Sequence, residues 1–140
     1  MLSIKYPEFL EHPTFCKMLD KYGLSTLTEF IHFYSVFVRD CERLGDDMEA
    51  LEFVVCGDDV GYLRTSNKTE RELFMGENRF KGIVDHDCLG VIATLYALSY
   101  ASMNAYENCW NFDSLDAARS KLRQYVDLRE DSSTIWRAID

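Results

Sequence analysis

Four consecutive residues, Asp85-His-Asp-Cys88, place oxygen, nitrogen and sulfur ligands next to one another in the chain. Such a set could bind a metal ion or carry acid–base chemistry at the start of a helix. Adjacent side chains of a helix project about 100° apart, however, so four in a row do not readily converge on one ion. The pattern therefore favours a structural role, in which Asp85 caps a helix and Asp87 stabilises its positive end.

No other catalytic signature accompanies this segment. The sequence contains no GxGxxG, P-loop, GxSxG or HExxH motif, and its three histidines, His12, His32 and His86, belong to three different expected elements. The five cysteines are a dispersed, odd-numbered set without a CxxC pair, which is typical of reduced thiols in a cytosolic protein. We therefore expect a protein without catalytic activity, cofactor or metal. An enzyme that uses Asp85, His86 or Cys88 is the alternative.

Acidic residues concentrate in one stretch of the chain. The whole sequence carries 24 acidic and 15 basic side chains, a net charge of −9, and residues 40–59 alone hold eight carboxylates and one base, a net charge of −7. This excess argues against binding to a nucleic-acid backbone through a basic face. The stretch is either a solvated face or a surface that binds a partner. The candidate partner-binding residues are Asp46, Asp47, Glu49, Asp58 and Asp59.

The elements that must position these residues follow the order helices, strands, helices, which indicates an α+β fold rather than βαβ units. Two hairpins are expected, at residues 50–65 around the turn Gly57-Asp-Asp59 and at residues 72–84, and they predict a small antiparallel sheet of three or four strands. About four to five helices should flank it, at residues 13–22, 26–44, from 85 onward, 114–128 and 133–140.

Two details of these helices carry specific predictions. Thr26 and Glu29 have the spacing of a capping box at the start of the second helix. Gly90 lies inside an expected helix, where glycine is unfavourable by about 1 kcal/mol relative to alanine, so we expect it to mark a close approach to the sheet.

The chain reads as one domain spanning residues 1–140, because no repeat, linker or low-complexity tract interrupts it. No uninterrupted apolar run reaches the roughly 18–20 residues of a membrane span. The N-terminus lacks the basic start and apolar core of a secretory signal. We therefore expect a cytoplasmic protein.

A set of short motifs occurs in order along the chain. The segment Gly90-Val-Ile-Ala-Thr-Leu-Tyr-Ala-Leu-Ser99 resembles the signature helix of the KlcA/ArdB family of antirestriction proteins. The other segments that resemble this family are Glu29, Gly61-Tyr62, Glu77-Asn-Arg-Phe-Lys-Gly82, Leu122-Arg-Gln-Tyr125 and the terminal Ile135-Trp-Arg-Ala-Ile-Asp140. Together the resemblance covers about residues 27–140.

The resemblance implies a small cytoplasmic protein of plasmids, phages or other mobile DNA that blocks the host's type I restriction systems without catalysis. Its partner would be the type I restriction–modification machinery or another DNA-processing protein, with no direct binding to nucleic acid or membrane. The chain departs from the family at Gly45-Asp-Asp-Met-Glu-Ala50 and at Gly57-Asp-Asp59, where carboxylates replace glycine, asparagine and aromatic residues.

Two other functions are compatible with the sequence. The chain could be an acidic DNA mimic that binds a DNA-processing enzyme, or a small accessory interaction module of a mobile element. A mimic needs a long stripe of carboxylates, because DNA presents about one charge per 1.7 Å of its axis. The 15 bases mixed into this chain therefore favour interference through a protein surface over mimicry.

Overall fold

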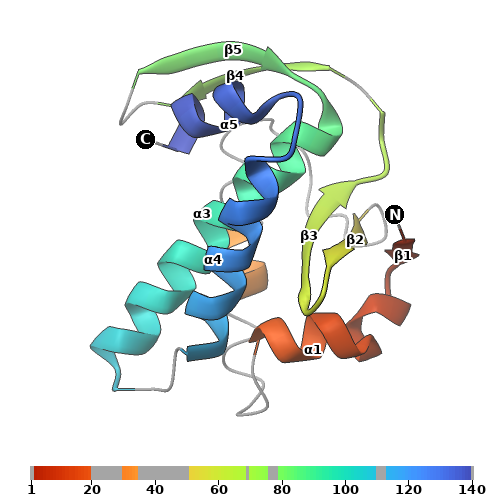
Figure 1. Cartoon of the computed structure of the whole chain (residues 1–140), viewed down its shortest axis with the longest axis vertical. Helices are drawn as coiled ribbons and strands as arrows, with labels where there is room; N and C mark the ends of the chain where they lie inside the picture. The colour runs from red at the N-terminus through yellow and green to blue at the C-terminus, as the bar shows by residue number, and fades with distance from the viewer. Residues whose placement is uncertain are drawn as a thin grey trace.

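Three strands form an antiparallel sheet in the order β1–β2–β3 (Figure 1). β2 (Leu51–Gly57) and β3 (Val60–Thr65) are joined by a tight turn at Asp58 and Asp59, as the sequence predicts. β1 (Leu2–Lys5) pairs with the other edge of β2. The computed structural model describes residues 2–19, 30–34, 51–68, 70–75, 79–109 and 113–139.

Two further strands, β4 (Arg71–Met75) and β5 (Phe80–Val84), form a separate antiparallel hairpin. The predicted α+β class is confirmed, with the strands divided between two small sheets. β1 was not expected from the sequence. Its four residues are at least partly exposed and too few to show a buried face, and the strand instead completes the open edge of β2.

The described helices occupy the positions expected for them, except for a short 3-10 helix near the N-terminus that the sequence analysis did not predict. They are the short 3-10 helix η1 (Glu8–Glu11), α1 (Pro13–Leu19), a helical segment at 30–34, α3 (His86–Glu107), α4 (Asp113–Val126) and α5 (Ser132–Ile139). The segment at 30–34 confirms the middle of the helix predicted at 26–44. The capping box at Thr26 and Glu29 lies outside the described residues.

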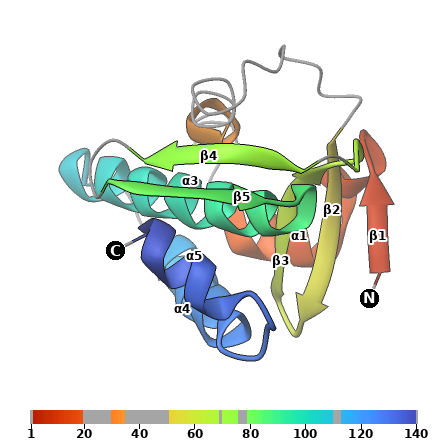
Figure 2. The same ribbon diagram turned by 90° about the horizontal axis from the view of Figure 1, so that it is seen from above.

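α3 is the central element of the fold. Figure 2 shows α4 and α5 beside α3, and Figure 1 shows that the β4–β5 hairpin lies over the N-terminal end of α3 and over α5. Thirteen of its residues are buried, because packing covers the helix on several sides. The side-chain oxygen of Thr94 accepts a hydrogen bond from the Leu63 amide of β3 at 3.0 Å.

Gly90 confirms the predicted close approach between this helix and the sheet. A Cβ atom at Gly90 would lie 2.6 Å from both the Leu63 carbonyl oxygen and the Cβ of Arg64, so only glycine fits at this crossing. The contact brings the first turns of α3 against β3, and with them the acidic residues that precede Gly90.

α3 also has the length and apolar composition of a membrane-spanning helix. Within the fold, however, 72% of that apolar stretch is buried. The hydrophobicity of α3 is therefore explained by its position in the core.

Candidate functional site

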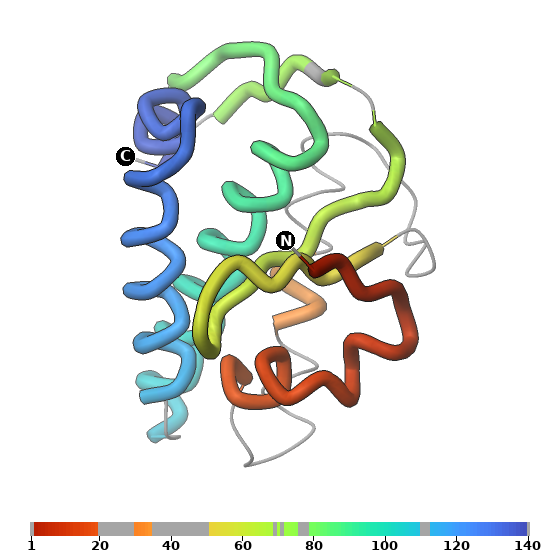
Figure 3. Tube along the Cα trace, turned by 45° about the vertical axis from the view of Figure 1, so that its right-hand side comes forward, coloured from red at the N-terminus to blue at the C-terminus, as the bar shows by residue number. Residues whose placement is uncertain are grey.

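The predicted partner-binding residues that the structure describes lie in the turn between β2 and β3. We call Asp58 and Asp59 the acidic turn. This turn lies beside α4 (Figure 3). Asp59 adopts a left-handed backbone conformation with φ of 60°, which asparagine and aspartate tolerate better than most residues. Asp46, Asp47 and Glu49 lie outside the described residues.

Two lysines face the carboxylate of Asp59. The Nζ of Lys17 in α1 is 3.0 Å from its Oδ1, and the Nζ of Lys121 in α4 is 3.9 Å from its Oδ2. The hydrogen bond from Lys17 holds the pKa of Asp59 below its usual value. Both ion pairs are solvent-exposed, so water screens them and they contribute little to stability. The charge of Asp59 is thus largely balanced, whereas Asp58 is exposed.

A more extensive set of charges surrounds Asp87 in the first turn of α3. Asp87 Oδ1 accepts hydrogen bonds from the Tyr62 hydroxyl at 2.7 Å and from Arg64 at 2.6 Å, both on β3. Its Oδ2 lies 2.8 Å from Arg129, in the connection between α4 and α5. Three donors from two distant parts of the chain therefore converge on one carboxylate.

Each arginine of this set also binds a second carboxylate. Arg64 donates to Glu52 of β2 at 2.7 Å, and Arg129 binds both oxygens of Asp131 at 2.7 and 2.8 Å. The guanidinium of Arg129 also lies over the ring of Tyr62, at 5.9 Å from its centroid. The ion-pair network consists of Glu52, Tyr62, Arg64, Asp87, Arg129 and Asp131.

Burial and hydrogen bonding set the ionisation of the network. Burial alone would raise the pKa of Asp87, but the hydrogen bonds from Tyr62, Arg64 and Arg129 outweigh it and hold the pKa below its ordinary value. The hydrogen bond from Arg129 likewise lowers the pKa of Asp131. Burial and the bond to Asp87 raise the pKa of the Tyr62 phenol. The network thus combines two guanidinium groups with three carboxyl groups.

The segment Asp85-His-Asp-Cys88 takes the structural role that the sequence favours. Asp85 caps α3, accepting a hydrogen bond from the Cys88 amide at 2.7 Å. Burial raises the pKa of the Cys88 thiol to about 12, so the reactive thiolate is scarce at neutral pH. His86 Nε2 is buried, and no residue that the structure describes forms a hydrogen bond with it. Within the described part of the chain, no group of three or more His, Cys, Asp or Glu residues could hold a metal ion.

The ion-pair network was not predicted from the sequence. Asp87 was assigned to the helix end, and Glu52 was counted with the acidic stretch, whereas it is buried against Arg64. An arginine and a glutamate inside the otherwise apolar β2–β3 hairpin were the available signal, because buried charges must be paired. The position of Arg129 beyond α4 gave no comparable signal.

The network and both hairpins lie within a region that matches a known family. The model of the antirestriction protein family matches residues 49–140. The chain belongs to the antirestriction protein family. The resemblance found in the sequence is thereby confirmed over all of its motifs except Glu29, which precedes the matched region.

The fold is shared with solved structures of this family. One such match is to a structure of the KlcA and ArdB proteins. The aligned region covers 85% of this chain and 82% of the solved chain, with a TM-score of 0.66 and 23% sequence identity. Those proteins are described as having a novel fold and antirestriction activity against type I DNA restriction systems in vivo but not in vitro. At this identity the likeness shows the fold alone. No curated protein matches the chain.

Proposed function

We propose that this chain is a non-catalytic antirestriction protein that acts in the cytoplasm and blocks host type I restriction of incoming plasmid or phage DNA. The observation that carries the proposal is the family match over residues 49–140, which includes both sheet hairpins and the helices α3, α4 and α5. The whole chain, residues 1–140, acts as one domain in this proposal.

Inhibition without catalysis is supported by how the reactive groups are engaged. Asp87 is held ionised by three hydrogen-bond donors, which leaves it poorly suited to deliver a proton. Burial raises the pKa of the Cys56 and Cys88 thiols to about 12, which disfavours nucleophilic attack by either sulfur. These groups have the environment of structural residues.

Interference through protein contacts accounts for more observations than DNA mimicry does. A mimic competes with DNA for the purified enzyme, so it should inhibit in vitro, whereas the solved KlcA and ArdB proteins act in vivo but not in vitro. In this chain Glu52 is paired internally and Asp59 faces two lysines, which interrupts a phosphate-like row of charges. We propose that the host machinery is reached through an acidic surface consisting of Asp46, Asp47, Glu49, Asp58 and Asp59.

Plating of unmodified phage tests this function. A host with an active type I system, with and without the chain, is infected with unmodified and with modified phage. We expect the chain to raise the plating efficiency of unmodified phage by about tenfold or more and to leave modified phage unchanged. Equal plating of unmodified phage with and without the chain would contradict the proposal.

A variant of the acidic surface is tested in the same assay. In it, asparagine replaces Asp46, Asp47, Asp58 and Asp59, and glutamine replaces Glu49. We expect it to lose protection, and a variant with Glu107→Gln and Asp113→Asn, which neutralises exposed carboxylates elsewhere, to keep it. Full protection by the acidic-surface variant would show that other residues contact the partner. If protection is lost and the wild-type chain also inhibits the purified restriction enzyme in a salt-sensitive manner, mimicry is the better explanation.

A further inference from the structure

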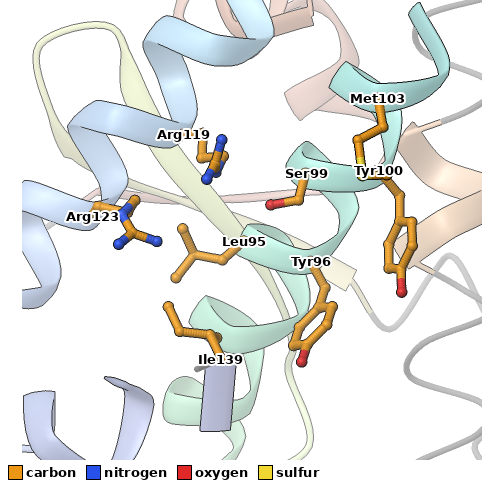
Figure 4. A pocket seen from close by; sticks show the side chains of 8 residues that line it. All are labelled: Leu95, Tyr96, Ser99, Tyr100, Met103, Arg119, Arg123 and Ile139. Atoms are coloured by element: carbon orange, nitrogen blue, oxygen red, sulfur yellow. The ribbon is translucent and has the colours of Figure 1, made fainter. Parts of the chain in front are cut away.

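A groove of about 370 Å³ lies between α3 and α4, away from the acidic turn. One side carries Arg119 and Arg123 of α4, and the other carries Tyr100 and Met103 of α3. Figure 4 shows the guanidinium groups of Arg119 and Arg123 on one side and the rings of Tyr96 and Tyr100 on the other, with Leu95 and Ser99 between them. The groove therefore combines a cationic wall with an apolar wall.

The cationic wall is unusual in a chain with a net charge of −9. Arg119 and Arg123 are four residues apart, so their side chains project from the same face of α4. The lining residues include these two arginines and no carboxylate. Asp116 approaches Arg119 from outside the lining at 3.7 Å, in an exposed contact that contributes little.

Aromatic packing orients Arg123 toward a ligand. Its guanidinium lies over the ring of Trp136, 4.7 Å from the centroid. A guanidinium stacked on a ring keeps its N–H edge available for carboxylates. Of the residues that the structure describes, none with a carboxylate forms an ion pair with Arg123.

The apolar wall is exposed and held in place by neighbouring rings. Tyr100 stacks on Phe33 at 5.5 Å and on Tyr96 at 6.2 Å, in both cases with a 25° angle between the planes. Tyr100 is nevertheless 39% exposed, and Met103 is 58% exposed. Rigid aromatic and adaptable methionine surfaces of this kind are enriched at protein interfaces.

We infer that this groove binds a peptide segment that carries carboxylates beside a large apolar side chain. The carboxylates pair with Arg119 and Arg123, and the apolar side chain packs on Tyr100 and Met103. The net negative charge of the chain opposes a nucleic acid, which is charged along its whole length, more strongly than a short peptide segment with a few carboxylates. That this segment belongs to the protein whose action the chain blocks rests on the proposed function.

Fluorescence anisotropy with a labelled peptide tests the groove directly. The probe carries Leu-Phe between two Asp-Glu pairs; in one control peptide Lys-Arg replaces the acidic pairs, and in another Gly-Ser replaces Leu-Phe. We expect the probe to bind and both controls to bind about tenfold more weakly or not at all. Binding of the basic peptide as tight as that of the probe overturns the inference, as does the absence of binding by the probe.

Variants of the chain locate the site. Arg119→Glu with Arg123→Glu should abolish probe binding, and Met103→Glu should do so without touching the arginines. Lys68→Glu, which reverses one positive charge at an exposed position outside the groove lining, should leave binding unchanged. Circular dichroism confirms that each variant is folded. Unchanged binding by the folded arginine and methionine variants overturns the inference.

The methionine methyl groups give a second readout on the unmutated chain. With ¹³C-labelled methionine, the probe should shift the methyl signal of Met103, while Met18 and Met75, which are buried elsewhere, serve as internal controls. A labelled single-stranded oligonucleotide that binds more tightly than the probe and shifts Met103 would assign the groove to nucleic acid. If the chain dimerises and the arginine variant does not, the groove is the binding site for a second copy of the chain. Either result overturns the inference.

The plating assay separates this inference from the proposed function. Peptide binding is measured without a restriction system, so failure of the wild-type chain to protect phage contradicts the proposed function alone. If the folded Arg119→Glu, Arg123→Glu variant loses the peptide but protects phage fully, the bound segment does not belong to the blocked machinery. Loss of both activities by this variant, with both retained by Lys68→Glu, supports the inference.

Discussion

Gly90 is the residue on which the crossing of α3 and β3 depends. The atoms that a side chain would meet there include the Leu63 carbonyl oxygen, which belongs to the backbone and cannot rotate away. Other residues of the crossing, such as Thr94, bind the same strand through a side chain. A single missing Cβ thus sets how closely the central helix approaches the sheet.

Replacement of Gly90 by alanine should therefore destabilise the fold. Alanine raises intrinsic helix stability by about 1 kcal/mol, but overpacking against backbone opposes it by up to about 3 kcal/mol, so we expect a net loss of about 2 kcal/mol. Urea denaturation monitored by circular dichroism measures the change. Ser120→Ala, at an exposed site of α4, is the control and should shift stability by less than about 0.5 kcal/mol. A Gly90→Ala protein as stable as the wild type would show that the helix can move away from β3.

Some residue roles could be predicted from the sequence and others could not. The cap at Asp85 and the close approach at Gly90 follow from local rules, since each concerns a residue and its own helix. The pairing of Glu52 with Arg64 also lies within one hairpin, yet the charge of Glu52 was assigned to the surface because neighbouring residues are acidic. Local composition was misleading there. The register of β2 against β3 places Glu52 opposite Arg64, and this pairing decides that the Glu52 side chain is buried.

The elements of the fold differ in how strongly their sequence patterns specify them. α5 has a clear apolar stripe, and Ile135 and Ala138 on it are fully buried against the rest of the fold. β1 has no such stripe and depends on β2 for its hydrogen bonds. Elements with their own amphipathic pattern were predicted, whereas an element defined by its partner was missed.

Truncation of one side chain in α5 measures how firmly this helix is attached. Ile135→Ala removes a fully buried side chain, and we expect a loss of about 2–5 kcal/mol in the free energy of unfolding. Leu128→Ala, at a position that is 83% exposed, removes a similar volume and should change stability by less than about 0.5 kcal/mol. Chemical denaturation of both variants checks the contrast. Equal stability of the two variants would show that α5 packs loosely.

At the scale of the whole molecule, the ion-pair network connects segments that lie far apart in the sequence. Glu52 belongs to β2, Asp87 to α3 and Arg129 to the connection after α4. No spacing rule relates Asp87 to Arg129, so this link of the network could be found only from the three-dimensional structure. The family resemblance located the region that contains it but assigned the charges no role.

The network predicts how stability depends on pH. Asp87→Asn removes a carboxylate that binds two arginines, and at neutral pH we expect a loss of about 3 kcal/mol. Because folding lowers the pKa of Asp87, its contribution is fully present above the ordinary aspartate pKa of about 3.9 and is lost as the pH falls through the lower folded value.

Urea denaturation at several pH values measures this dependence. The stability difference between the wild type and Asp87→Asn should be constant above about pH 5 and shrink below about pH 4. Asp116→Asn, whose carboxylate is exposed, is the control and should show little difference at any pH. A difference for Asp87→Asn that does not change with pH would show that lost packing, and not the charge, causes the destabilisation.

The order of the strands in the first sheet also has a consequence for synthesis in the cell. Leu2, at the start of the chain, lies opposite Val55, and the central helix that completes the core ends only at Glu107. β1 therefore leaves the ribosome long before β2 has been synthesised. The aromatic side chains that follow β1 stay exposed until α3 is complete. Interrupted translation yields an unfinished polypeptide with apolar surface exposed, which is a substrate for proteases.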